Sequence, residues 1–262
     1  FVPMSSPSTR PTPATAPDVS PPRRHPVLLF DLDGTLIDSL QLLVGAMTHA
    51  FDSREGPRPT VEQWVATIGR PLMWQFGQYA TGEDDLQQLV RTYRAFQYEH
   101  HDRLTRTFDG IPALIERLRT AGHPLGVVTS KADHLANRSL TYVGLAPSFD
   151  VVVGADRTTK HKPDPDPLWF ALAALDDRPD RTVYIGASPF DVMAGNAAGT
   201  VTIGVTWGAA THHQLLVREE QPMSALPPPM FRFDAATDSD GGPDQDDRSV
   251  EEIWWPAKLT VP

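Results

Sequence analysis

The stretch Val27-Leu28-Leu29-Phe30-Asp31-Leu32-Asp33-Gly34-Thr35 decides the fold of this chain. Its four leading apolar residues are typical of a short strand that is buried on both faces of a parallel sheet. Open α/β sheets bind their ligands at the carboxyl ends of such strands. Because Gly34 can take a positive φ, the chain can turn sharply there and bring Asp33 beside Asp31. The stretch therefore predicts an α/β fold with a ligand site at these two aspartates.

The run VLLFDLDGTLIDS, residues 27–39, resembles motif I of the haloacid dehalogenase-like (HAD) hydrolases. The alternative is an ordinary acidic turn at Asp33-Gly34, which the apolar run before it disfavours. In the family the first aspartate is a nucleophile that becomes an aspartyl phosphate, and the second is the general acid and base. The resemblance implies these roles for Asp31 and Asp33. Elementary chemistry agrees, because a carboxylate nucleophile splits phosphoryl transfer into two steps and a neighbouring carboxyl can move the protons.

Composition disfavours or excludes several classes of protein. The 262 residues carry a formal net charge of -10, which disfavours a nucleic-acid backbone or an anionic membrane as a partner. Cysteine is absent, so disulfides and thiolate metal sites are excluded. No apolar run approaches the roughly 20 residues that span a bilayer, and the N-terminal region lacks the apolar segment of a signal peptide. We expect a cytoplasmic protein without nucleic-acid or membrane partners.

The chain divides into four parts by composition and periodicity. Residues 1–26 hold eight prolines and predict a disordered, Pro-rich arm. Residues 39–107 show helical spacing and no strand signal, with Thr60 as a helix cap and a long helix over about 83–101. This helical insertion resembles the C1-type cap domain of the family, which covers the active site and sets substrate choice. Residues 27–38 and 108–217 are the predicted core, and residues 218–262 an acidic, Pro-rich, largely irregular tail.

Two features of the predicted cap carry charge. Arg70 lies in the loop Gly69-Arg70-Pro71-Leu72, where its guanidinium could bind a second anionic group of the substrate. A surface arginine at a turn is an equally good interpretation. His100 and His101 stand next to carboxylates, but adjacent residues on a helix point about 100° apart and chelate a metal poorly. We therefore favour a structural role for both histidines at the helix end.

Two further motifs stand at the ends of predicted core segments. A strand at 125–129 ends in Thr129-Ser130-Lys131, and a hydroxyl at a strand end before a helix suits a phosphate. This resembles motif II of the family, which implies that Thr129 binds phosphate, with Ser130 and Gly34 beside it. A plain helix cap at Thr129 is the disfavoured alternative. The run Lys160-His161-Lys162-Pro163-Asp164-Pro165-Asp166-Pro167 resembles motif III, which implies that Lys162 offsets the carboxylates and orients the phosphoryl group, whereas Lys160 is solvated.

The fourth motif departs from the family pattern. Segments 181–186 and 201–205 predict two more strands, and the run that begins Ala187-Ser188 and contains Asp191 resembles motif IV, whose common form is GDxxxD. Ala187 stands where the family's first aspartate usually binds Mg²⁺, and a methyl group cannot replace an oxygen ligand. The resemblance implies Mg²⁺ bound by Asp31, by the backbone carbonyl of Asp33, and by Asp191, the last directly or through a water that Ser188 could orient.

Four motifs in order predict a doubly wound parallel sheet with an inserted helical cap. Residues 93–102, 108–110 and 127–131 resemble the phosphoglycolate phosphatase and PpaX-type pyrophosphatase branch of the family. The implied function is Mg²⁺-dependent hydrolysis of a small phosphorylated substrate, a phosphate ester or pyrophosphate, through an aspartyl phosphate on Asp31. The alternative, suggested by Ala187, is a phosphate-binding protein with lost or weakened turnover. An engineered change at position 187 of an ordinary enzyme would give the same sequence.

Overall fold

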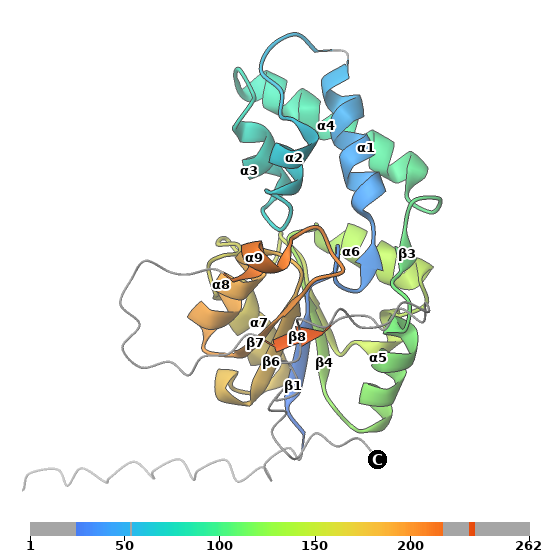
Figure 1. Ribbon diagram of the computed structural model, residues 1–262, viewed down its shortest axis with the longest axis vertical. Helices are drawn as coiled ribbons and strands as arrows, with labels where there is room; N and C mark the ends of the chain where they lie inside the picture. The colour runs from blue at the N-terminus through green and yellow to red at the C-terminus, as the bar shows by residue number, and fades with distance from the viewer. Residues whose placement is uncertain (1–24, 53, 217–230, 234–262) are drawn as a thin grey trace, which may run out of the picture.

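A six-stranded parallel sheet forms the centre of the molecule, in a computed structural model that describes residues 25–52, 54–216 and 231–233 (Figure 1). The strand order is β5-β4-β1-β6-β7-β8, so β1 lies between β4 and β6. The strands are β1 Val27–Phe30, β4 Leu125–Val128, β5 Val151–Val153, β6 Thr182–Gly186, β7 Val201–Val205 and β8 Phe231–Phe233. The predicted α/β fold with a parallel sheet is thereby confirmed.

Helices cover both faces of the sheet, as a doubly wound fold requires. Alternate residues of β1 point to opposite faces, so Leu28 and Phe30 join one hydrophobic cluster and Val27 and Leu29 the other. The first cluster includes residues of α5 Ile111–Thr120 and α6 Asp133–Tyr142, and the second includes residues of α7 Asp166–Leu175 and α8 Pro189–Ala198. The short elements are η1 Ala146–Ser148, η2 Pro179–Arg181 and α9 His212–Leu215.

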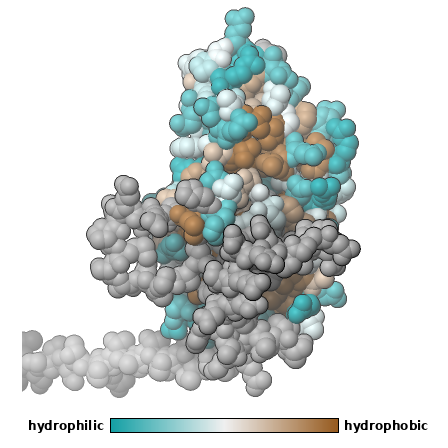
Figure 2. All heavy atoms as spheres, viewed as in Figure 1, coloured by the Kyte–Doolittle hydropathy of each residue, from teal (hydrophilic) through white to brown (hydrophobic). Residues whose placement is uncertain are grey.

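Four helices form a separate layer beyond the carboxyl ends of the strands (Figure 1). They are α1 Leu40–Asp52, α2 Val61–Val65, α3 Leu72–Gly77 and α4 Glu83–His100. They pack around a hydrophobic cluster of their own that includes Phe51, Trp64 and Phe76. Hydrophobic side chains also gather on the visible surface of this layer (Figure 2). Thr60 caps α2 as predicted, because its side chain accepts a hydrogen bond from the Gln63 N–H.

The structure corrects the sequence interpretation in one place and adds to it in another. Within 39–107 the chain forms a strand, β3 Arg106–Thr107, which pairs antiparallel with β2 Ile37–Asp38 where the chain leaves and enters the helical layer. A two-residue strand leaves no periodic pattern in the sequence. The tail, predicted to be largely irregular, contributes the three-residue strand β8, which pairs with β7 and satisfies backbone groups on that side of β7. The rest of the tail and residues 1–24 lie outside the described residues.

The described part of the chain includes no helix with the length and apolarity that crossing a bilayer requires.

Candidate active site

Asp31 and Asp33 follow β1 and lie together at the carboxyl end of the sheet. Gly34 has a φ of +83°, and the N–H groups of Leu36 and Ile37 both donate to the carbonyl oxygen of Leu32, so the chain turns sharply as predicted. Asp31 is buried and Asp33 is partly exposed. Each carboxylate accepts hydrogen bonds on Oδ1 only, as far as the described residues go. The Oδ2 atom of each aspartate is therefore available to a ligand.

Lys162 is a buried cation that joins two carboxylates. Its side chain is 1% exposed, and its Nζ lies 2.8 Å from Asp31 Oδ1 and 2.6 Å from Asp191 Oδ1. The same Nζ lies 3.2 Å from the hydroxyl of Tyr184. A lysine can be buried in this way only because its charge is paired. The structure thus brings together three of the predicted residues, each from a different motif.

Asp191 accepts four hydrogen bonds, which is about as many as a carboxylate can accept. Its Oδ1 accepts from Lys162 and from the hydroxyl of Tyr184, and its Oδ2 accepts from the N–H and the hydroxyl of Ser188. Ser188 and Asp191 form a capping box at the start of α8. Asp191 therefore holds Lys162 in place in this structure. The metal contact expected of Asp191, and the water contact expected of Ser188, stay predictions.

Burial and neighbouring charges change the pKa values of Asp31 and Lys162. Burial and the nearby Asp191 charge raise the pKa of Asp31 to about 7, although Lys162 acts in the opposite direction. Burial acts to lower the pKa of Lys162, but the charges of Asp191 and Asp31 outweigh it and the pKa is raised. Lys162 is therefore charged at neutral pH. A further cation beside Asp31 would favour its ionised form, which is the form that a nucleophile needs.

Thr129, Ser130 and Lys131 follow β4, the neighbour of β1 in the sheet. The buried Thr129 hydroxyl accepts a hydrogen bond from the Lys131 N–H, at 3.2 Å. Ser130 Oγ donates to the carbonyl oxygen of Gly69 in the loop between α2 and α3. Lys131 Nζ lies 2.7 Å from Asp33 Oδ1, with a side chain that is 6% exposed. Sequence reasoning missed this second buried cation, although its place two residues after Thr129 put it near the strand end.

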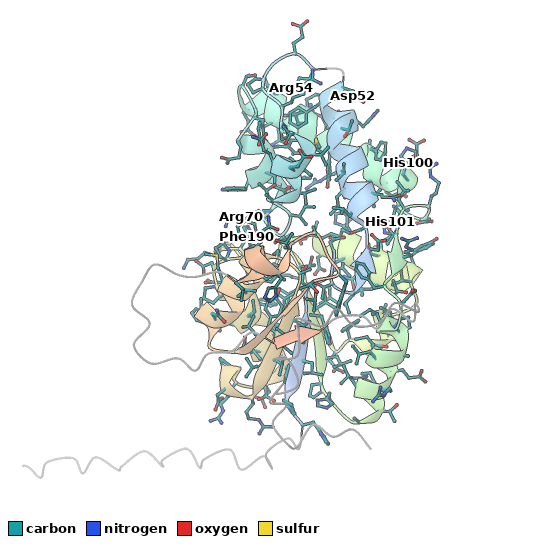
Figure 3. The ribbon with its side chains drawn as sticks, in the orientation of Figure 1. Asp52, Arg54, Arg70, His100, His101 and Phe190 are labelled. Carbon is teal, nitrogen blue, oxygen red and sulfur yellow. The ribbon has the colours of Figure 1, made fainter. Side chains whose placement is uncertain are left out.

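Arg70 bridges the helical layer and the core. Its Nη1 donates to the carbonyl oxygen of Lys162 at 3.0 Å, and its guanidinium carbon lies 4.4 Å from the ring centroid of Trp74 and 5.4 Å from that of Phe190. Figure 3 shows Arg70 beside Phe190 at this junction. The Nε atom of Arg70 is buried and has no partner among the described residues. Arg70 is thus more than a surface arginine, and its contact with a substrate stays a prediction.

Two cavities meet at the two aspartates, and both are lined by Asp31, Asp33 and Gly69. The first has a volume of about 300 Å³ and includes Gly34, Ala187 and Ser188 in its lining. The second has a volume of about 270 Å³ and includes Thr129, Ser130 and Arg70. Lys162 and Asp191 line neither cavity. The positive charge of Lys162 therefore acts on the site through its contact with Asp31.

Ala187 follows β6 and contributes no metal ligand. It is buried and belongs to a hydrophobic cluster with Ile203 and Val205. Across residues 25–52, 54–216 and 231–233, no cluster of three or more His, Cys, Asp or Glu side chains is arranged to hold a metal ion. The two aspartates with free Oδ2 atoms do fit Mg²⁺ in its common setting, bound by one or two carboxylates and a substrate phosphate. Two carboxylates are too few to form a metal site from protein ligands alone.

The two histidines make structural contacts, in line with the role favoured above. The His100 ring packs against Phe96, with 4.2 Å between ring centroids. His101 Nδ1 lies 2.7 Å from Asp102 Oδ1, and its Nε2 lies 2.8 Å from Ser139 Oγ. Ser139 is fully buried, so this Ser-His-Asp arrangement presents no nucleophile to a substrate. It joins the end of α4 to α6, and burial lowers the pKa of His101.

Known proteins resemble this chain in sequence and in fold. The profile of the haloacid dehalogenase-like hydrolases matches residues 28–205. The chain is 36% identical to the pyrophosphatase PpaX of Bacillus velezensis over 185 residues, which are 71% of this chain and 85% of that protein. A haloacid dehalogenase-like hydrolase from Bacteroides fragilis has a crystal structure that matches with a TM-score of 0.68 and 27% identity, over 73% of this chain and 92% of that one. A predicted phosphoglycolate phosphatase from Haemophilus somnus matches with a TM-score of 0.63 and 25% identity, over 70% and 86%.

Proposed function

The chain belongs to the haloacid dehalogenase-like hydrolases and is an enzyme of that family, and from this premise we propose that it hydrolyses a small phosphate ester or pyrophosphate through an aspartyl phosphate on Asp31. One observation carries the proposal. The Oδ1 of Asp31 is bound by a buried lysine, whereas its Oδ2 is free and the residue lines two cavities together with Asp33. A carboxylate that lines a cavity with one oxygen anchored and the other unpaired is positioned for attack on a ligand.

The two aspartates divide the work. In the first step Asp31 forms a bond to phosphorus while the bond from phosphorus to the leaving oxygen breaks, and Asp33 gives that oxygen a proton. In the second step water attacks the phosphorus of the aspartyl phosphate, Asp33 takes the proton of that water, and the bond to Asp31 breaks. Ser39 and Lys131 both bind Asp33 Oδ1, at 2.6 and 2.7 Å, and so orient the carboxyl for these transfers.

The transferred phosphoryl group is bound at the ends of β1 and β4. Thr129 lines the second cavity with Asp31, and Ser130 lines it one residue further on. Gly34, three residues after Asp31, belongs to the lining of the first cavity. Lys162 contacts Asp31 and supplies a fixed positive charge beside the reacting oxygens. Helices α1 to α4 act as the cap, because α1 and α2 contribute to the walls of both cavities and α3 and α4 to the walls of the second.

The cofactor in this proposal is Mg²⁺. Its ligands are the carboxylate of Asp31 and the backbone carbonyl oxygen of Asp33, which leaves the Asp33 carboxyl free to move protons. The four hydrogen bonds to Asp191 leave that carboxylate no free acceptor in this arrangement. When bound, the ion supplies positive charge that offsets the phosphate and the aspartates. Glu62 adds negative charge around the first cavity, as does Asp38, although Asp38 is paired with Arg106 at 2.7 Å. This favours a cation on the side of Asp31 where Ala187 stands.

The alternative of a non-catalytic phosphate-binding protein finds no support among the relatives, which are named as hydrolases. Its basis was Ala187 alone. The retention of Asp31, Asp33 and two buried lysines around them favours turnover, because binding a phosphate does not require two adjacent carboxylates.

Phosphate release from a panel of small phosphorylated compounds, with and without Mg²⁺, tests this function. We expect the parent chain to release phosphate from at least one compound, and Asp31→Asn to lose that activity by about a thousandfold or more, because the nucleophile is gone. Lys160→Gln, which changes an exposed side chain two residues from Lys162, is the control and should keep the parent rate. Equal rates for the parent and Asp31→Asn would overturn the proposal.

A further inference from the structure

The two cavities differ in the charges along their walls. The first is lined by Asp38 and Glu62 beside the two aspartates, and no lysine or arginine among the described residues lines it. The second is also lined by the two aspartates and by Asp156, but it adds three cationic side chains, Arg70, Arg94 and Lys131. Opposite charges at close range attract strongly where water is partly excluded. An anionic group of a ligand is therefore favoured in the second cavity and disfavoured in the first.

Arg94 on α4 differs from the other two cations of the second cavity, because its charge is not compensated within the described chain. Lys131 is paired with Asp33 at 2.7 Å. Arg70 donates to a core carbonyl and lies over two aromatic rings. Arg94 is exposed, like Arg91 on the same helix, and makes no hydrogen bond or ion pair with any described residue. His161 also lines this cavity, but burial and then Arg70 lower its pKa, so at neutral pH it adds little positive charge.

Two buried N–H donors on the same walls have no partner within the described residues. They are Trp64 Nε1, in a side chain that is 1% exposed, and Arg70 Nε. Both residues line the second cavity. A buried donor without an acceptor costs free energy, and native structures rarely leave one unsatisfied. An acceptor oxygen of a ligand that comes within reach of either donor would satisfy it.

We propose that the second cavity binds the leaving group of the substrate and that this leaving group is itself an anion, a phosphate or a carboxylate, which pairs with Arg94. The inference rests on the proposed function, because it places the transferred phosphoryl group at Asp31 and Thr129. The volume of about 270 Å³ lies below the range of about 300–1,000 Å³ that is typical of sites for drug-sized ligands. A compact anionic leaving group suits this space better than a nucleoside does.

Substrate discrimination tests the role of Arg94. The probes are pyrophosphate, 2-phosphoglycolate and 2-hydroxyethyl phosphate, which has a neutral leaving group of similar size to glycolate. Arg94→Gln should lower the ratio of kcat/KM for an anionic probe over the neutral probe by about tenfold or more, mainly through KM, because a charge-assisted contact is lost. Arg94→Lys should retain part of the ratio. Comparison of pyrophosphate with 2-phosphoglycolate distinguishes a phosphate from a carboxylate as the preferred anion.

Arg91→Gln is the matched control, because Arg91 lies on the same helix, is exposed and contacts Gln88 rather than the cavity. It should keep the parent ratio. If Arg94→Gln also keeps the parent ratio, the inference is wrong.

Calorimetric binding of pyrophosphate to Asp31→Asn separates this inference from the proposed function. Adding Arg94→Gln to that variant should weaken binding by about tenfold or more. If the parent chain releases no phosphate from any probe, the proposed function fails. Weaker binding in the double variant would then still support the anion site, and equal binding would overturn it.

Discussion

The hydroxyl of Ser130 donates a hydrogen bond of 2.5 Å to the carbonyl oxygen of Gly69. It joins the end of β4 in the core to the loop between α2 and α3, beside the two aspartates. Arg70, the next residue of that loop, donates to the carbonyl oxygen of Lys162. One short loop of the cap therefore contacts the core at Ser130 and at Lys162. Gly69 of this loop lines both cavities.

Gly69→Ala should separate the cap from the core. Gly69 has a φ of +104°, and a Cβ atom there would lie 2.5 Å from Ser188 Oγ, so the loop must move away. We expect kcat/KM to fall by about tenfold or more, because a small misplacement of groups around the substrate costs at least that much. The control is Gly77→Ala at the end of α3, where a Cβ would meet nothing within 4 Å. Equal losses in the two variants would contradict a specific role for the Gly69 contact.

Lys162→Met should destabilise the fold as well as the reaction. It leaves Asp31 and Asp191 as buried carboxylates without the cation that both contact. Breaking a buried pair in this way costs about 3–5 kcal/mol. Tyr184→Phe removes only a neutral hydroxyl from Asp191 and should cost about 1 kcal/mol. Lys160→Met should cost less than about 0.5 kcal/mol. Urea unfolding measures all three, and a loss in Lys162→Met no larger than in Lys160→Met would count against the buried pair.

Ala187→Asp should strengthen the binding of Mg²⁺ at the active site. The new carboxylate would enter the lining of the first cavity beside Asp31 and Asp33. We expect the Mg²⁺ concentration for half-maximal phosphate release to fall by about tenfold, which corresponds to about 1.4 kcal/mol. Without Mg²⁺ the same variant should be less stable than the parent, because three carboxylates then repel one another. Ala187→Asn, of similar size without the charge, is the control. An unchanged Mg²⁺ requirement would contradict a metal at this side of Asp31.

His101 should make stability depend on pH. Burial lowers its pKa, so the folded state binds fewer protons than the unfolded state at pH values below the ordinary value of about 6.5. The uncharged His101 therefore contributes to the free energy of unfolding above about pH 6.5. This contribution is lost as the pH falls from there through the lower pKa that His101 has in the folded state. Urea unfolding at about pH 7.5 and 5.5 should therefore show a smaller loss on acidification for His101→Gln than for the parent. The same loss in both would show that another group is responsible.

The sequence predicted the sheet and the strand-end site because their signals are local. The apolar run before Asp31 and the positive φ of Gly34 follow from residue types in a few neighbouring positions. The capping function of Thr60 is local in the same sense. Strand β8 and the β2–β3 pair are not local, because they depend on backbone pairing between distant segments.

The contacts of the site that the sequence did not predict also join residues that lie far apart along the chain. Tyr184 stands inside β6 between valine and isoleucine, where nothing in the sequence marks its hydroxyl as a partner of Asp191. Arg94 and Trp64 come from different helices of the cap, and only the packing of those helices on the core brings them to one cavity. Periodicity predicts each helix but not the packing between helices.

The central claim is that Asp31 becomes phosphorylated during turnover. Its most direct test is rapid acid quenching of the reaction with a substrate that the parent chain hydrolyses, followed by mass spectrometry of the proteolytic peptides. We expect a peptide that contains Asp31 to gain the mass of one phosphoryl group, located on that residue by fragmentation, and Asp31→Asn to show no such gain. A phosphoryl group on another residue, or parent turnover with an unmodified Asp31 peptide at every quench time, would contradict the claim.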